Sequence, residues 1–206
     1  MPDGRTERAK RLREERREQI LVAARRVIAD KGYPATSVAD VIGSAGISRG
    51  TFYLYFEGRE QLFVELVDTF LARLTDAVEV IGLDDDTPKE KLFGNFRRVI
   101  DILVSNADLT TVLFREAVGV SADIDARVNE FYAFLHRMVV GALRKGVRRG
   151  ITRSVVDDEL VATGLVGMVK EVVYTRVVAH RDTDALDPDH LTAVIFDFAL
   201  RGLLPA

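Results

Sequence analysis

The chain has 206 residues, of which 48% are hydrophobic and 30% charged, and only 5 are proline. This composition is typical of one globular domain or of two small ones, and it argues against disorder. Because the sequence lacks cysteine, disulfide frameworks, thiolate nucleophiles and zinc–thiolate sites are excluded. The longest uncharged stretch, residues 160–169, is too short to span a bilayer, and residues 1–17 lack the apolar core of a signal peptide. We therefore expect a cytoplasmic protein without a membrane partner.

The formal net charge of −3 is unevenly distributed along the chain. Residues 1–60 carry 12 Lys and Arg against 9 Asp and Glu, whereas residues 61–206 carry 17 against 23. This asymmetry is mild and fits ordinary solvated surfaces. A nucleic-acid partner would therefore have to be attracted by a local patch rather than by the field of the whole protein.

Hydrophobic periodicity predicts helices throughout the chain, and no segment alternates like a half-buried strand. The first apolar-periodic helix ends before Gly32. Ser37, with Asp40 three residues later, is typical of a capping box that opens a short helix, and Ser48 caps a second one. The prediction is an all-α fold of about nine helices, the first ending near residue 31 and the others covering residues 37–45, 49–55, 60–81, 89–106, 108–116, 123–149, 157–179 and 188–203.

Residues 36–56 contain the two short helices, separated by a glycine-centred turn. Apolar residues are spaced along both helices so that they pack against the preceding helix, which leaves the outer face of the second one free. A helix-turn-helix presents its reader to the major groove in this way. The free face holds a guanidinium suited to guanine, a hydroxyl with a methyl group, and two phenols suited to phosphates, from Arg49, Thr51, Tyr53 and Tyr55. The two tyrosines would equally fit packing against a neighbouring helix.

The run from Gly46 to Phe63 resembles the signature of the TetR family of transcriptional regulators. An aromatic run follows a Gly-Ile-Ser turn, and the Arg-containing start of a long helix follows at once. The resemblance extends from about residue 17 to 67, whereas the rest of the chain resembles the family only in the number and length of its helices. Ile42 departs from the family, which usually has alanine there, and Gly43 lies in the same helix. This departure is expected to widen the helix crossing or to shift the second helix.

The resemblance implies a three-part division of the chain. Residues 1–16 form a charged basic N-terminal arm, residues 17–59 form the DNA-binding domain, and residues 60–206 bind an effector and dimerise, with residues 60–81 as the connecting helix. The arm would enter the adjacent minor groove or, alternatively, form a helical charged extension. The implied DNA contacts include phosphate contacts at the start of the first short helix, base edges read from the second and a cationic phosphate clamp at residue 59. The residues concerned are Thr36, Ser37, Ser48, Arg49, Gly50, Thr51, Tyr53, Tyr55 and Arg59.

The effector half is expected to provide a dimer interface and a ligand pocket. By resemblance, the last two helices pair with their symmetry mates in a homodimer, although ordinary intrachain packing would explain part of their apolar surface. Aromatic and flexible apolar residues would line a pocket for a small hydrophobic or aromatic effector. The candidate lining residues are Phe70, Phe93, Phe96, Ile100, Phe114, Phe131, Phe134, Met138, Met168, Glu171 and Tyr174.

An enzyme is not expected, because the sequence shows no Gly-rich phosphate loop, nucleophile elbow or His–Glu metal pair. We accordingly predict no catalytic residues, no metal and no cofactor. The prediction is a ligand-responsive DNA-binding transcriptional regulator, a dimeric repressor released from a palindromic double-stranded operator by a small hydrophobic effector. The alternatives are an activator of the same fold and a helical dimeric interaction protein that does not bind DNA.

Overall fold

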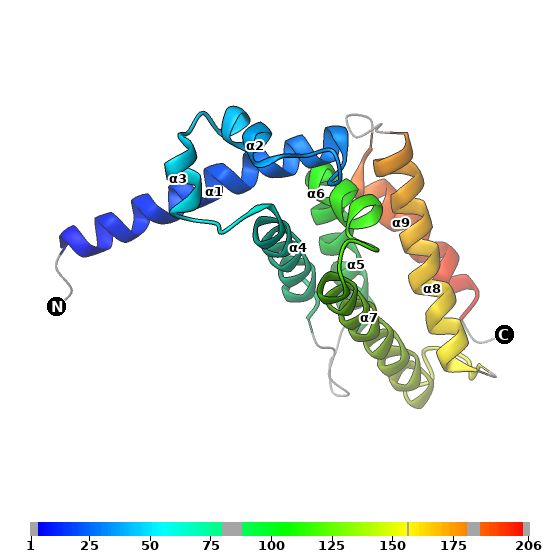
Figure 1. Cartoon of the computed structure of the whole chain (residues 1–206). Helices are drawn as coiled ribbons and strands as arrows, with labels where there is room; N and C mark the ends of the chain where they lie inside the picture. The colour runs from blue at the N-terminus through cyan, green and yellow to red at the C-terminus, as the bar shows by residue number, and fades with distance from the viewer. Residues whose placement is uncertain (1–3, 80–87, 156, 181–185, 204–206) are drawn as a thin grey trace. The chain divides into compact units, whose positions relative to one another are not determined.

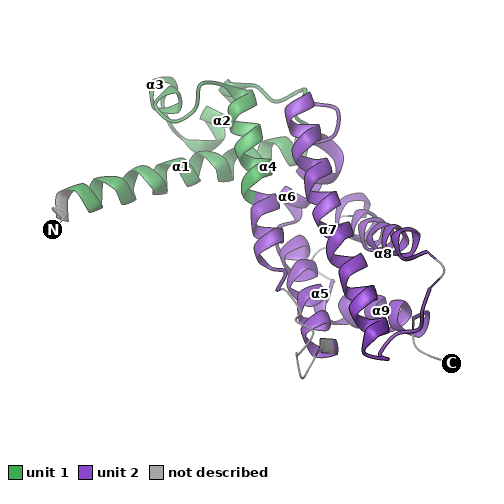
Figure 2. Ribbon diagram, turned by 90° about the horizontal axis from the view of Figure 1, so that it is seen from below, with its two compact units in different colours: residues 1–69 green, residues 70–206 purple. Residues whose placement is uncertain are grey.

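Helices provide all the regular structure in the described parts of the chain (Figure 1). The computed structural model describes residues 4–79, 88–155, 157–180 and 186–203, and within these ranges it contains nine α-helices, two π-helical segments and no strand. The chain divides into two compact units, residues 1–69 and 70–206, and the boundary falls inside a helix (Figure 2). The predicted all-α class is confirmed. None of the helices within the described ranges has the length and apolar character that crossing a membrane would require.

The first unit contains α1 (Gly4–Lys31), α2 (Val38–Ala45), α3 (Arg49–Tyr53) and the first part of α4 (Arg59–Asp76). Helices as short as α2 and α3 are marginal in isolation, so tertiary packing has to hold them. The packing comes from side chains that have almost no exposure in the folded chain, among them Ile20, Ile28, Val41, Phe52, Phe56 and Phe63.

Capping fixes the ends of α2 and so aims α3. Ser37 Oγ accepts a hydrogen bond from the Asp40 amide at 3.2 Å, and Asp40 Oδ2 accepts one from the Ser37 amide at 2.7 Å, which confirms the predicted capping box. At the other end Gly46 adopts φ +64°, a left-handed conformation that glycine accepts without strain. The helix is regular through Gly43 despite the departure from the family pattern.

The charged N-terminal extension is helical and continuous with α1 from Gly4 onward. Ion pairs one turn apart support it, with 3.9 Å between Lys10 Nζ and Glu14 Oε1 and 3.5 Å between Arg11 Nε and Glu15 Oε1. The described residues of this segment are therefore helical, and its entry into the minor groove stays a prediction.

The second unit begins with the end of α4 and continues with helices that pack in pairs, α5 against α9 and α7 against α8. The rings of Phe93 and Phe96 meet Phe196 of α9 at centroid distances of 5.2 and 6.1 Å. The elements beyond α4 are α5 (Pro88–Ser105), α6 (Ala107–Thr111), η1 (Val112–Glu116), α7 (Ala122–Arg148), α8 (Asp158–Val173), η2 (Tyr174–Ala179) and α9 (Pro188–Arg201).

Three of the predicted helices end differently in the structure. α4 ends at Asp76 instead of near residue 81, because α5 takes over the backbone hydrogen bonds of the next residues. Asn95 bonds both the amide and the carbonyl of Glu79 at 2.9 Å, and Arg98 Nε donates to the Ala77 carbonyl at 2.8 Å. The predicted helices over residues 108–116 and 157–179 each finish in π-helical turns, η1 and η2, which lie against each other.

Candidate functional site

The outer face of α3 is exposed and polar over most of its length. Ser48 caps the helix, its Oγ accepting from the Thr51 amide at 3.0 Å, and Phe52 points inward with no exposure. Arg49, Gly50 and Tyr53 are exposed, and Tyr53 retains 46% of its accessible surface. The phenol of Tyr53 is therefore available to a partner and is not part of the core.

Short-range contacts orient the side chains of this face. The Arg49 guanidinium lies 5.8 Å from the centre of the Tyr53 ring, and the Thr51 and Ser48 hydroxyl oxygens are 2.8 Å apart. The Tyr53 ring is in turn held edge-on to Phe52, at 5.4 Å between ring centres. One helix thus presents a cation, two hydroxyls and a phenol together. Base edges and phosphates accept hydrogen bonds from donors of these kinds. Tyr55 is half-buried beyond the end of α3.

The two residues at the start of α2 that were expected to contact phosphates differ in exposure. Ser37 is exposed, but Thr36 is only 1% exposed. The Thr36 hydroxyl donates to the Gly32 carbonyl at 2.8 Å and its amide donates to the Tyr33 carbonyl at 3.1 Å. The Thr36 hydroxyl is therefore used inside the protein, where it holds the turn between α1 and α2, and its phosphate contact stays a prediction.

Arg59, expected as a phosphate clamp, makes internal bonds. Its Nη1 donates to three backbone carbonyls of the turn between α1 and α2, at 2.7 Å to Thr36, 3.1 Å to Tyr33 and 3.2 Å to Pro34. The guanidinium also lies 4.4 Å from the centre of the Tyr33 ring, which stacks on Phe63 of α4 at 4.2 Å. Arg59 thereby fastens the first turn of α4 to the helix-turn-helix.

Arg17 forms a second fastening that the sequence analysis did not identify. Its guanidinium forms a two-pronged pair with the Glu65 carboxylate, with 2.6 Å between Nε and Oε1, and donates to the Tyr55 carbonyl at 3.2 Å. It also lies 4.7 Å from the centre of the Phe56 ring. The Arg17 side chain of α1 therefore links the residues just after α3 to α4. The partners are 38 and 48 residues away, so no local pattern signals them.

The only acidic residue in the first turn of α2 is neutralised by a neighbouring lysine. Asp40 Oδ2 lies 2.6 Å from Lys31 Nζ. The hydrogen bond from Lys31, followed by those from Ser37, holds the pKa of the Asp40 carboxyl well below its usual range. The start of α2 thus keeps an ionised carboxylate whose charge is balanced, so it does not repel an anion as an unpaired one would.

An apolar cavity of about 410 Å³ lies within the second unit and is lined by residues of α4, α5, η1, α7, α8 and α9. Its walls are almost entirely aliphatic and aromatic. The predicted lining residues that it brings together are Phe96, Ile100, Phe114, Phe131 and Met138.

Six other predicted lining residues do not line this cavity. Phe70 is a core residue of α4 with 1% exposure, and Phe93 is turned onto Phe196. Glu171 and Tyr174 are exposed on the surface. Phe134 and Met168 are half-buried outside the lining. Helical periodicity identifies an apolar stripe, but it does not distinguish which part of that stripe faces the cavity and which part faces the core.

A few polar groups interrupt the apolar lining. They are Asn95, Arg137, Lys145, Thr152 and Lys170. Lys170 Nζ lies 5.2 Å from the centre of the Tyr132 ring, and burial raises the pKa of that phenol above its ordinary value. Arg137, Lys145 and Lys170 give the lining positive charge, and Arg137 and Lys170 are exposed.

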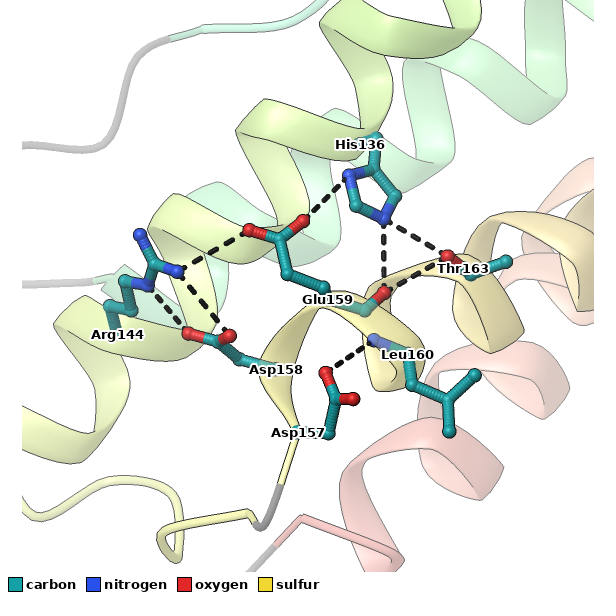
Figure 3. A network of polar contacts seen from close by, with 7 residues as sticks. All are labelled: His136, Arg144, Asp157, Asp158, Glu159, Leu160 and Thr163. Carbon is teal, nitrogen blue, oxygen red and sulfur yellow. Dashed lines mark hydrogen bonds and ion pairs between the residues drawn. The ribbon is translucent and has the colours of Figure 1, made fainter.

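The polar network between α7 and α8 is a structural link (Figure 3). His136 Nε2 is 3.0 Å from both the Glu159 carbonyl and Thr163 Oγ1, and its Nδ1 lies 3.3 Å from Glu159 Oε2. Arg144 pairs with Asp158 at 2.5 Å in the same region. Both ring nitrogens of His136 are thus occupied. Among the residues that the structure describes, no three His, Asp or Glu side chains are grouped to hold a metal ion.

One side of α8 and one side of α9 carry apolar residues that nothing in the single chain covers. Leu160 is 68% exposed, and Val194 and Phe198, one turn apart on α9, are 53% and 71% exposed. On α8, a side chain placed at Gly164 or Gly167 would meet no atom within 4 Å. Exposed apolar groups beside open glycines are suited to close approach by another helix.

Comparisons with known proteins agree with this arrangement. The profile described as "Bacterial regulatory proteins, tetR family" matches residues 20–66, and that described as "Tetracyclin repressor-like, C-terminal domain" matches residues 85–203. The chain is 26% identical over 166 residues to the fatty acid metabolism regulator protein of Bacillus subtilis, covering 81% of this chain and 86% of the relative. It is 30% identical over 152 residues to the HTH-type transcriptional repressor KstR2 of Mycolicibacterium smegmatis, covering 71% and 72%.

Solved structures with this fold include further regulators. FadR from Bacillus subtilis in complex with stearoyl-CoA matches with a TM-score of 0.68 and 26% identity, covering 90% of this chain and 98% of that chain. PfmR from Thermus thermophilus matches with a TM-score of 0.76 over 88% and 97%, and its 23% identity shows the fold alone. The family profiles, the exposed polar face of α3 and the helical second unit lead to one conclusion: the chain belongs to the TetR family of DNA-binding transcriptional regulators.

Proposed function

We propose that the protein is a dimeric repressor that leaves a palindromic operator when an effector with a long apolar body and an anionic group binds its second unit. Within this proposal residues 17–59 bind DNA, and residues 60–206 bind the effector and dimerise. The observation that carries it is the exposed donor set on α3, capped by Ser48 and backed by the fully buried Phe52. These groups lie on the face opposite Phe52, where they can donate hydrogen bonds to DNA.

The chemistry of the cavity supports the effector class. A volume of about 410 Å³ falls within the range of small-molecule sites, and the apolar lining favours an aliphatic or ring-shaped body. Arg137 and Lys170 would pair with an anionic group such as a carboxylate or phosphate. FadR of Bacillus subtilis, described in complex with stearoyl-CoA, offers a precedent for an acyl thioester among similar proteins.

The helix α4 supports a route from effector to DNA. Its residue Leu74 lines the cavity, and its residue Arg59 is bonded to the turn that precedes α2. An effector that prefers one placement of α4 would therefore shift the DNA-binding head, residues 17–59, which Arg59 and Arg17 bond to α4. Coupling of this kind is typically worth about 1–3 kcal/mol.

The first experiment tests DNA binding. Full-length protein is used to select duplexes from a randomised library, and the enriched duplex is then titrated in gel shifts across a salt series. We expect an enriched palindrome and an affinity that falls steeply with salt, because phosphate contacts release counterions. Failure to enrich any sequence, or an affinity insensitive to salt, would contradict the proposal.

The second experiment tests the effector class on the complex with the selected duplex. Palmitoyl-CoA and palmitate are expected to release the protein, and hexadecanol, which has a similar chain without the charge, is expected to be less effective. The double replacement Arg137→Ala with Lys170→Ala should reduce the response to the anionic ligands, whereas Arg148→Ala, at an exposed position outside the cavity, should not. If hexadecanol released the protein from the duplex at the same concentrations as palmitate, the effector would not need an anionic group.

A third measurement separates repression from activation. The selected duplex is placed upstream of a reporter, and expression is compared with and without the protein. If the protein is a repressor, it lowers reporter expression, and palmitoyl-CoA restores that expression in a coupled transcription reaction. A signal raised by the protein would identify an activator of the same fold.

A further inference from the structure

The most exposed large apolar residue among those that the structure describes lies at the end of α3, the helix proposed to read DNA. Leu54 is 74% exposed, although it directly follows α3 and continues its helical backbone with φ −72° and ψ −19°. Its neighbours on the same segment, Arg49 and Tyr53, are polar at their tips. Leu54 is therefore an apolar group among the donors that the proposed function places against DNA.

Helix geometry places Leu54 at the middle of the outer face of α3, which is the proposed reading face. Successive residues of an α-helix are about 100° apart, so the direction opposite the buried Phe52 lies between Gly50 and Leu54. The Leu54 amide donates to the Gly50 carbonyl at 3.3 Å, which confirms that these two residues are one turn apart. Arg49 and Tyr53 flank this line on one side and Thr51 flanks it on the other. Because Gly50 has no side chain, Leu54 is the group that projects from the centre of the reading face.

The major groove offers one apolar group at base-pair edges, the C5 methyl of thymine. The other edge groups are hydrogen-bond donors and acceptors, which lose water without compensation when an aliphatic side chain covers them. We propose that Leu54 is a specificity-determining residue that contacts a thymine methyl in each half-site. This proposal rests on DNA binding by α3 and adds to it the base that the centre of the helix selects.

The test removes only the methyl group. In the duplex selected by the full-length protein, each thymine of a half-site is replaced in turn, and symmetrically in both half-sites, by deoxyuridine. For the unaltered protein we expect one position at which affinity falls by about fourfold per half-site, the contribution of one buried methyl-sized group. Leu54→Ala should bind the thymine and uracil duplexes equally at that position and should retain any other preferences.

Two further variants serve as controls. Leu54→Met keeps an apolar side chain of similar size and should retain discrimination between thymine and uracil. Val118→Ala, at a position 68% exposed in the second unit, should behave like the unaltered protein. Because Leu54 is exposed, its replacement should leave the helix content and unfolding transition unchanged, as circular dichroism would show.

The outcomes are distinguishable. Equal uracil sensitivity of the unaltered protein and Leu54→Ala at every position would overturn the assignment while leaving DNA binding intact. A change in the oligomeric state of Leu54→Ala, with unchanged DNA affinity, would instead identify a protein contact and would also overturn it. If the library yields no enriched duplex, the reading role of α3 fails, and the assignment of Leu54 fails with it.

Discussion

Arg59 donates through a single guanidinium nitrogen to three carbonyls of the turn between α1 and α2, so its hydrogen bonding serves the protein itself. We predict that Arg59→Ala lowers the free energy of unfolding by about 1–3 kcal/mol, because carbonyls that accepted from a charged donor lose it. Operator affinity should fall for all sequences, with little change in its dependence on salt. Urea unfolding and gel shifts across a salt series would measure the two effects.

Arg49→Ala is the matched control for Arg59, because Arg49 is exposed and makes no bond to the turn. Its stability should stay within about 0.5 kcal/mol of the unaltered protein, while discrimination at one base pair falls by about 1–3 kcal/mol. An Arg59→Ala protein of unchanged stability whose salt slope drops by about one unit would show that Arg59 contacts a phosphate after all.

Asp40 gives the first unit a predictable dependence on acid. Because Lys31 and Ser37 hold its folded-state pKa below the unfolded value, the carboxylate stabilises the fold above the unfolded pKa of about 3.9. That contribution is lost as the pH falls through the lower folded-state value. We therefore expect Asp40→Asn to be less stable than the unaltered protein near pH 6, and the difference to shrink as the pH is lowered below 3.9.

Thermal unfolding of both proteins across this pH range measures the difference. Asp30→Asn is a suitable comparison, since Asp30 is exposed near the end of α1 and its carboxyl has no part in the capping box of α2. A gap between Asp40→Asn and the unaltered protein that stays constant down to acidic pH would contradict the ionic origin of the stabilisation.

At the residue scale, the sequence predicts the role of a side chain when that role depends only on the helix to which the residue belongs. The positions of Ser37, Ser48 and Arg49 follow from capping preferences and from the 3.6-residue period. Thr36 and Arg17 do not follow, because their roles depend on contacts that only the folded chain brings together. A hydroxyl next to a helix start satisfies either a phosphate or the preceding turn, and only burial decides between them.

At the element scale, Gly50 tests how closely α3 approaches DNA. A Cβ at Gly50 would meet only Ser48 Oγ at 3.9 Å, an ordinary contact, so alanine fits within the protein. We predict that Gly50→Ala raises stability by up to about 1 kcal/mol, since alanine favours helix, yet lowers operator affinity because the new methyl group occupies the centre of the reading face. Chemical unfolding and gel shifts would show the opposite signs.

Gly43→Ala provides the matched control on α2. A Cβ there meets nothing within 4 Å, and Gly43 is a helical residue like Gly50. It should stabilise the protein to a similar extent without the loss of affinity. Equal operator binding by Gly50→Ala and the unaltered protein would mean that the helix does not approach the groove at this point.

The helices themselves were predictable because their apolar periods are long, but their ends were less so. α4 stops at Asp76 because Asn95 and Arg98 of α5 bind the backbone that follows, a tertiary effect with no local signal. The π-helical turns of η1 and η2 likewise interrupt segments whose sequences read as continuous helix. The cavity was expected from aromatic content, but its lining depends on which helix pairs are in contact.

At the scale of the whole molecule, operator binding depends on two heads held at the spacing of one DNA turn. We propose that the apolar surface of α8 and α9 holds them, and Phe198, 71% exposed on α9, is the most exposed apolar residue of that surface. Phe198→Asp would place a charge in the interface of each copy, and burying two unpaired carboxylates is strongly unfavourable. Sedimentation should then show a monomer. Operator affinity should fall by about 10²–10⁴-fold, because the second half-site is no longer bound intramolecularly.

Val118→Asp introduces the same charge at another exposed apolar position of the second unit, 68% exposed before replacement. It should remain dimeric and bind the operator normally, which separates the interface from a general effect of charge. In the Phe198→Asp monomer the hydrogen bonds of Arg17 and Arg59 lie within one chain and stay intact. The head should therefore still bind a single half-site weakly, with about half the salt slope of the dimer, since half of the phosphate contacts remain. A dimer that persists with this replacement would locate the interface elsewhere on the chain.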